Sequence, residues 1–160
     1  MQLNANLSEQ VKVVEGLLST VPSTSTPDYV SLKNYERCMI LVQVRNATTV
    51  TGSAITLLQA TAVAGTGEKA LPFARALRNL DTAAGDVLSE FAVTSNTFTT
   101  DSTNSKNLMY VIEVKAEDLD VNGGYDCIRA GTGNGTAATV SVTYFLFGAK
   151  FPTTTAAITD

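Results

Sequence analysis

The sequence predicts an all-β fold: an antiparallel β-sandwich, jelly-roll-like, preceded by an N-terminal arm or short helix. Several segments between residues 35 and 151 alternate apolar and polar residues, the pattern of strands with one buried face. Short stretches rich in Gly, Asn and Thr separate these segments, as expected of turns. Thr occupies 23 of the 160 positions, and β-branched residues suit exposed strand faces.

Residues 1–27 are expected to form an N-terminal arm and a linker. Within residues 8–18 Ser8 is a candidate helix cap, and the apolar residues have helical spacing. The residues on this helical face are Val11, Val14, Leu17 and Leu18. Gly16 weakens a helix, so a partly ordered arm is the alternative. Residues 19–29 hold two prolines and are expected to be extended.

The sandwich itself is expected over residues 28–152. Residues 35–46 predict its first long strand, with a core side and a wet side. The core side holds Cys38, Ile40, Val42 and Val44, and the wet side holds Arg37, Gln43 and Arg45. Residues 53–63 predict a second strand, and residues 68–73 predict a short edge segment that contains Pro72.

The middle of the chain gives a mixed signal. A helical turn is expected over residues 74–80, followed by a strand over residues 87–93. The remaining expected strands cover residues 108–119, 125–130 and 138–151. A polar loop precedes the first of these strands, and Gly-rich turns separate the others. Residues 153–160 are expected to be a flexible C-terminal tail.

Composition and charge argue against several classes of function. The net charge is −4, from 11 Lys and Arg against 15 Asp and Glu, and no basic stripe is present for direct nucleic-acid binding. No apolar run reaches the roughly 18 residues that a membrane helix requires, and the N-terminus lacks the pattern of a secretory signal. Cys38 and Cys127 are expected to be buried thiols rather than a disulfide framework.

The residue types also disfavour catalysis. The chain contains neither His nor Trp, so the common general base, zinc ligand and catalytic triads are missing. The segment "AGTGEKA" at 64–70 fails the phosphate-loop pattern, because Glu68 separates Gly67 from Lys69. We therefore expect no catalytic residue, no cofactor and no bound metal. A small hydrolase with two paired carboxylates is the alternative.

One stretch resembles a calcium loop. The segment "DLDVNGGYDCIRA" at 118–130 opens with acidic and amide residues at the spacing of an EF-hand, but its twelfth position is Arg129 instead of Glu. A cation there would repel the ion. Asn122 and the two glycines after it suit a tight turn, because such residues adopt positive φ values readily. A polar turn between two strands is therefore the prediction.

Four segments of the chain resemble a family of small structural proteins of tailed bacteriophages, the head decoration or cement proteins. They are "DYVSLKNYERCMILVQV" (28–44), "TLLQATAVAGTGEKALPF" (56–73), "NSKNLMYVIEVKAEDLDVNGGYDCIRA" (104–130) and "ATVSVTYFLFGAKF" (138–151). The resemblance covers most of residues 28–151. Residues 1–27 and 74–103 match less well.

The resemblance implies a non-enzymatic virion protein that binds the outer surface of the capsid and stabilises it. Its expected partners are the major capsid protein and further copies of itself, as a dimer or trimer, with assembly in the reducing host cytoplasm. Val11, Val14, Leu17 and Leu18 are the candidate capsid-contact residues; the alternative is that they cover the protein's own sandwich. The alternative function is a receptor- or carbohydrate-binding β-sandwich module of a phage tail or fibre.

Overall fold

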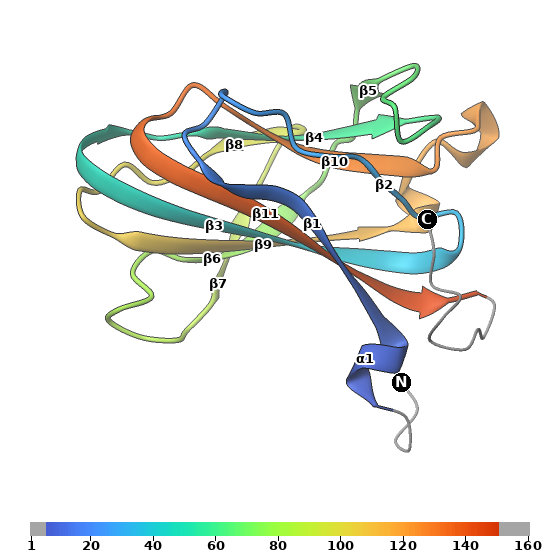
Figure 1. Ribbon diagram of the computed structural model, residues 1–160, viewed down its shortest axis with the longest axis horizontal. Coiled ribbons are helices and arrows are strands. Elements are labelled where there is room, and N and C mark those ends of the chain that lie inside the picture. The colour runs from blue at the N-terminus through green and yellow to red at the C-terminus, as the bar shows by residue number, and fades with distance from the viewer. Residues whose placement is uncertain (1–5, 151–160) are drawn as a thin grey trace.

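Two antiparallel β-sheets pack face to face in the computed structural model, which describes residues 6–150 (Figure 1). The larger sheet has six strands, in the order β1 (Val11–Thr20), β11 (Thr136–Ala149), β3 (Tyr35–Thr51), β9 (Asn107–Lys115), β6 (Arg75–Asn79) and β7 (Ser89–Ala92). The five-stranded sheet has the order β2 (Val30–Ser31), β10 (Cys127–Gly133), β4 (Ala54–Ala60) and β5 (Lys69–Ala70), and β8 (Thr97–Thr99) also pairs with β4. The predicted β-sandwich is confirmed.

Connections between the two sheets are frequent. The chain crosses from one sheet to the other after β1, β2, β3, β5, β7, β8, β9 and β10. One consequence is that β11, the last strand, lies between β1 and β3 in the larger sheet. The order β1-β11-β3-β9 facing β2-β10-β4-β5 is compatible with a jelly roll, which stays a prediction.

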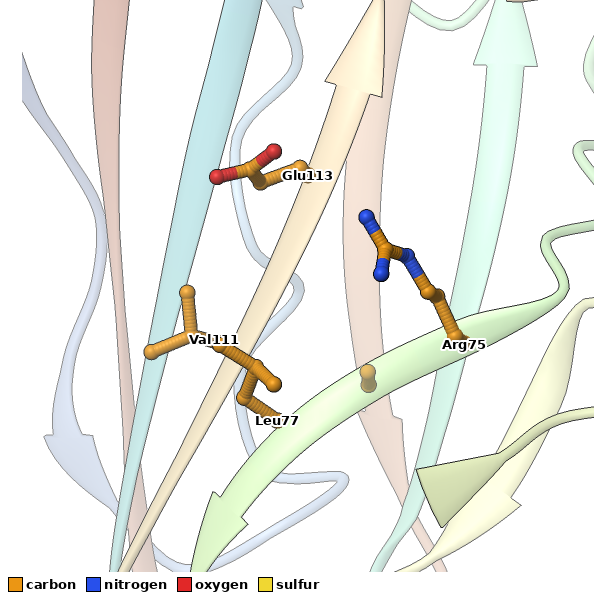
Figure 2. A pocket seen from close by; sticks show the side chains of 5 residues that line it. Arg75, Leu77, Val111 and Glu113 are labelled. Carbon is orange, nitrogen blue, oxygen red and sulfur yellow. The ribbon is translucent and has the colours of Figure 1, made fainter. Parts of the chain in front are cut away.

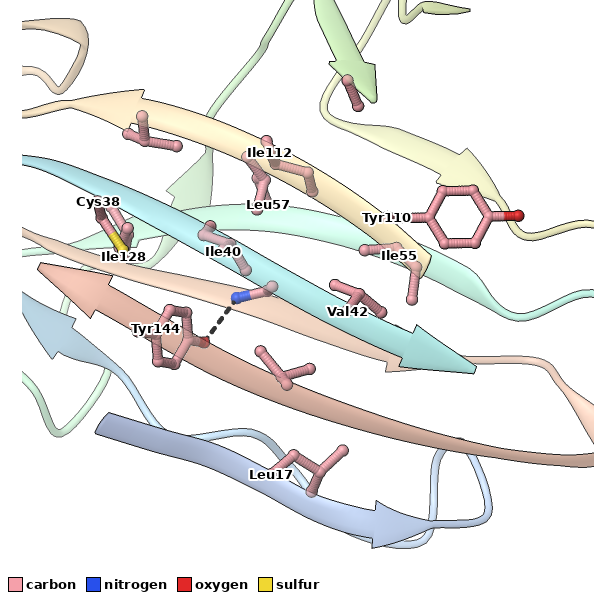
Figure 3. Close-up of a cluster of buried hydrophobic side chains, with 14 of the residues drawn as sticks. Leu17, Cys38, Ile40, Val42, Ile55, Leu57, Tyr110, Ile112, Ile128 and Tyr144 are labelled. Carbon is pink, nitrogen blue, oxygen red and sulfur yellow. Dashed lines mark hydrogen bonds between the residues drawn. The ribbon is translucent and has the colours of Figure 1, made fainter. Parts of the chain in front are cut away.

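Alternate residues of the facing strands fill the core (Figure 3). Its fully buried side chains include Ile40, Val42, Ile55, Leu57, Ile112, Ile128, Val140 and Val142. The inward residues expected from the alternation in β3 all lie in this cluster. Both cysteines are free and buried, as predicted, and burial raises the pKa of each thiol to about 12.

The predicted helix over residues 8–18 is wrong. Helix α1 covers only Leu7–Gln10, and the chain then forms β1, which pairs with β11 at the edge of the larger sheet. The register of this pair shifts between Glu15 and Leu17. A bulge adds a residue and breaks the period of two, so the inward residues Val14 and Leu17 are three apart, as on a helix.

The predicted helical turn over residues 74–80 is also wrong. Residues Arg75–Asn79 form strand β6, which pairs with β9 on one side and β7 on the other. Ala76 faces the core and Leu77 faces away from it, so apolar residues on the two faces of a strand are adjacent in sequence. The strand expected after this segment is present as β7.

Tyr144 connects the two sheets and the N-terminal strand (Figure 3). Its hydroxyl accepts a hydrogen bond from the Ala130 backbone N–H of β10 at 3.0 Å and donates one to the Asp28 carbonyl at 3.0 Å. Gly16 of β1 lies against the ring, where an added Cβ would be 2.3 Å from the Tyr144 Cε2 atom. No residue with a side chain fits there without a shift of the strand or the ring.

Candidate functional site: the outer face of the larger sheet

The larger sheet is apolar on its outer side as well as on its core side. Residues directly opposite each other in a sheet project to the same side, so the pairing gives the outward set. Val13, Phe145 and Met39 form one row across β1, β11 and β3. Leu41, Val111 and Leu77 form another across β3, β9 and β6, and that row continues through the polar residues Thr143 of β11 and Glu15 of β1. Two further outward residues, Val11 and Phe147, are paired. We call these eight apolar residues the outer face.

Burial supports this assignment. Val111 is only 8% exposed, yet it is not part of the core cluster, so its neighbours on the outer face cover it. Met39, Leu41, Leu77, Phe145 and Phe147 are partly exposed and do not pack against the core either. Val13 is 60% exposed. Strands that are apolar on both sides are typical of sheets covered on both sides, so this surface has the composition of an interface.

Charged side chains border the apolar rows. Arg37 of β3 and Glu113 of β9 lie on the same side of the sheet as Met39. Neither forms an ion pair or a side-chain hydrogen bond with another residue in the range 6–150. Arg75 is 2.9 Å from Glu90, but both side chains are largely exposed, so this pair contributes little to stability. Opposite charges that are available to a partner, on Arg37 and Glu113, therefore lie at the border of the outer face.

A small depression lies at the β6 end of the outer face (Figure 2). Its lining residues are Arg75, Ala76, Leu77, Val111 and Glu113, and its volume is about 110 Å³. Sites for small organic ligands usually measure roughly 300–1,000 Å³. The depression is a minor irregularity of the surface, and the area around it is the feature suited to binding a macromolecule.

The four residues predicted to share one face of an N-terminal helix point in different directions. Leu17 is buried in the core, and Val14 packs against it. Val11 is 9% exposed and lies opposite Phe147 on the outer face. Leu18 is 68% exposed. Two of the four thus cover the protein's own sandwich, which was the alternative, and Leu18 is the one whose side chain is largely exposed.

Residues 118–126 form the predicted polar turn between β9 and β10, and β10 begins at Cys127. The Asp118 carboxylate accepts the Lys115 backbone N–H at 2.8 Å, and the Asp120 carboxylate accepts the Gly123 N–H at 3.0 Å and pairs with Lys69. Lys69 holds the pKa of Asp120 below its ordinary value. Gly124 has φ +79°, which closes the turn in the left-handed conformation. Both carboxylates are engaged within the protein.

Arg129, at the twelfth position of the segment 118–130, also has a structural role. Its Nη2 atom is 2.7 Å from the Glu68 carboxylate, and its guanidinium lies over the Tyr29 ring at 4.7 Å. Burial and the hydrogen bond to Glu68 raise the pKa of Tyr29. These contacts hold the β4–β5 connection against β10. Among residues 6–150 no cluster of His, Cys, Asp or Glu is suited to hold a metal ion.

Sequence reasoning missed the outer face. Arg37, Gln43 and Arg45 indicated a wet side for β3, but Met39 and Leu41 lie between them on that same side. The signal that identifies the surface is the continuity of the apolar runs, "CMILV" in β3 and "YFLF" in β11. A strand with one wet side alternates, whereas a strand covered on both sides does not.

Comparisons with known proteins give no match: no protein-family model, no curated protein and no solved structure matches this chain. No helix in the described part of the chain is long and apolar enough to cross a membrane.

Proposed function

We propose that this protein is a non-enzymatic structural component of a bacteriophage virion that binds the outer surface of the capsid and stabilises it. The observation that carries the proposal is the outer face, an apolar sheet surface on a sandwich whose core is already complete without it. Such a surface costs solubility unless a partner covers it, so it indicates a protein that works by assembly. The resemblance of residues 28–151 to head decoration proteins is the reason to propose a phage capsid as that assembly.

A rigid sandwich suits this role. A decoration protein has to hold neighbouring capsid subunits together against internal pressure. When several linked copies bind at once, the overall affinity exceeds that of each weak contact. The proposed partners are the major capsid protein and further copies of this chain. Of the four candidate contact residues, Leu18 has the side chain that remains accessible for the capsid, at the edge strand β1.

The test uses expanded capsids that lack the protein. We expect the purified full chain to co-sediment with them at saturable stoichiometry and to raise their resistance to heat. Leu18→Asp should weaken this binding at least about tenfold, because it places a charge in a desolvated contact. Val87→Asp is the matched control, since Val87 is 82% exposed in the connection between β6 and β7.

Failure of the parent protein to bind such capsids, with no change in their heat resistance, contradicts the proposal. Binding to glycans on an array without capsid binding would instead support a tail or fibre module that recognises a receptor.

A further inference from the structure

We propose that the outer face is the interface between two copies of this chain, packed face to face about a twofold axis, with Arg37 of each copy opposite Glu113 of the other. The inference deepens the proposed function, on which it rests for the idea that the protein works by assembly. It names one partner, a second copy, and the surface that binds it.

The first argument is shape and composition. The outer face consists of the outward rows of a regular sheet, in which β11, β3 and β9 are paired over most of their lengths. Two such faces can interdigitate at the usual sheet separation of about 10 Å, as the two sheets do inside each copy. The side chains that would meet are large and apolar, among them Met39, Leu41 and Phe145.

The second argument is charge. In the pairing of β3 with β9, Arg37 is opposite Lys115, and Met39 is opposite Glu113. Arg37 and Glu113 are therefore diagonal neighbours on one face, with opposite charges. Lys115 is already paired with Glu117 at 3.0 Å, whereas Arg37 and Glu113 have no ion pair with any residue from 6 to 150.

A twofold axis makes these two charges complementary. In an isologous interface, if Arg37 of one copy contacts Glu113 of the other, the reverse contact forms as well. Arg37 and Glu113 of both copies are then paired, at the border of the apolar rows. A partner of uniform charge would satisfy one of the two and repel the other. The face is therefore self-complementary, which favours a second copy over a partner of uniform charge.

The test is a charge exchange measured on the purified full chain, without capsids. We expect sedimentation equilibrium to show a dimer. Arg37→Glu and Glu113→Arg should each weaken dimerisation at least about tenfold, because each places like charges opposite each other twice. The double variant, R37E with E113R, should return the dissociation constant to within about threefold of the parent value, because both contacts are restored in reverse.

Matched controls separate the interface from the fold. Arg45→Glu makes the same change on the same strand and side, beyond Gln43 and away from the apolar rows, and should leave the dimer unchanged. Met39→Glu places a charge among the apolar rows and should give a monomer. Far-UV circular dichroism and urea denaturation should show that each variant remains folded, since all four side chains point away from the core.

Three results would overturn the proposal: a parent protein that is monomeric at about 100 µM, a trimer, or a double variant that associates as poorly as the single variants. Because no capsid enters the experiment, these results leave the capsid-binding test unaffected. Conversely, a dimer that does not bind capsids would support this interface and contradict the proposed function.

Discussion

Tyr144 shows how much of this fold depends on single side chains. It is fully buried in the larger sheet, and its hydroxyl reaches the smaller sheet at Ala130 and the linker at Asp28. A buried phenol keeps both hydrogen bonds because the backbone groups it meets are shielded from water. The residue thus joins three segments that are far apart in sequence.

Tyr144→Phe should destabilise the protein by about 1–3 kcal/mol, because it removes the hydroxyl and leaves a buried N–H and a carbonyl without this partner. Urea denaturation should show a lower midpoint with an unchanged slope. Tyr125→Phe is the control, since the Tyr125 hydroxyl donates to the Gly67 carbonyl at 2.8 Å at an exposed site. Equal urea midpoints for the two variants would contradict this role of the Tyr144 hydroxyl.

Other residue positions were predictable because burial follows from residue type. Cys38 begins the apolar run "CMILV", Cys127 lies in the short predicted strand at 125–130, and both are buried. The partners of polar groups were not predictable. Asn46 is only 4% exposed and donates to the Asp101 and Thr103 carbonyls at 2.9 Å. Nothing near Asn46 in the sequence indicates a loop that lies more than fifty residues away.

Strand β1 is defined by the glycine at its bulge. Gly16 allows the strand to pass over the Tyr144 ring, and its carbonyl accepts the Asp28 N–H at 2.8 Å. The position therefore needs the absence of a side chain more than it needs flexibility. The sequence suggested that Gly16 weakens a helix, whereas in the structure it allows a strand to pack closely.

Gly16→Ala should destabilise the protein by about 1–3 kcal/mol, because the added methyl group overlaps the Tyr144 ring and pushes β1 from the sheet. Hydrogen exchange should accelerate in residues 11–20 more than in β3. Gly85→Ala is the matched control: an added Cβ at Gly85 has nothing within 4 Å, and no positive φ opposes it. Unchanged exchange in β1 of the Gly16 variant would contradict this account.

At the element scale, the sequence predicted the strands that alternate regularly and missed those that do not. Burial alternates with a period of two for nine residues or more in β3 and β11, and β9 departs from this period only at Val111. β1 loses it at a bulge, and β6 is apolar on both sides, so both resemble helices in sequence. The outer face was missed for a related reason: the polar residues of β3 indicated a wet side, although the continuous apolar runs in β3 and β11 are typical of strands covered on both sides.

Two ion pairs connect distant parts of the whole molecule. Lys69 in β5 pairs with Asp120 in the β9–β10 connection, and Lys106 pairs with Asp81 across the β6–β9 end of the larger sheet. The hydrogen bond from the lysine lowers the pKa of each carboxyl. Folding therefore favours the charged form of both carboxylates.

Acid should destabilise the fold in a defined window. Because both folded pKa values lie below the unfolded value of about 3.9, this contribution is fully present above that pH and is lost as the pH falls through the folded values. The Tm of the D81N/D120N variant should be lower than the parent at pH 7 and should fall less on acidification. Asp86→Asn is the control, as Asp86 pairs with no residue in the described range. Identical pH profiles for parent and double variant would contradict this linkage.

The position of β11 has a consequence for biosynthesis. It is the last strand of the described chain, yet it separates the first strand from the third and pairs with both along most of its length. A nascent chain that has emerged as far as residue 130 still lacks the strand that joins β1 to β3, so one edge of each of these strands has no partner. The sandwich therefore completes only after residues 136–149 have emerged from the ribosome, and until then a chaperone or a neighbouring nascent chain has access to those edges.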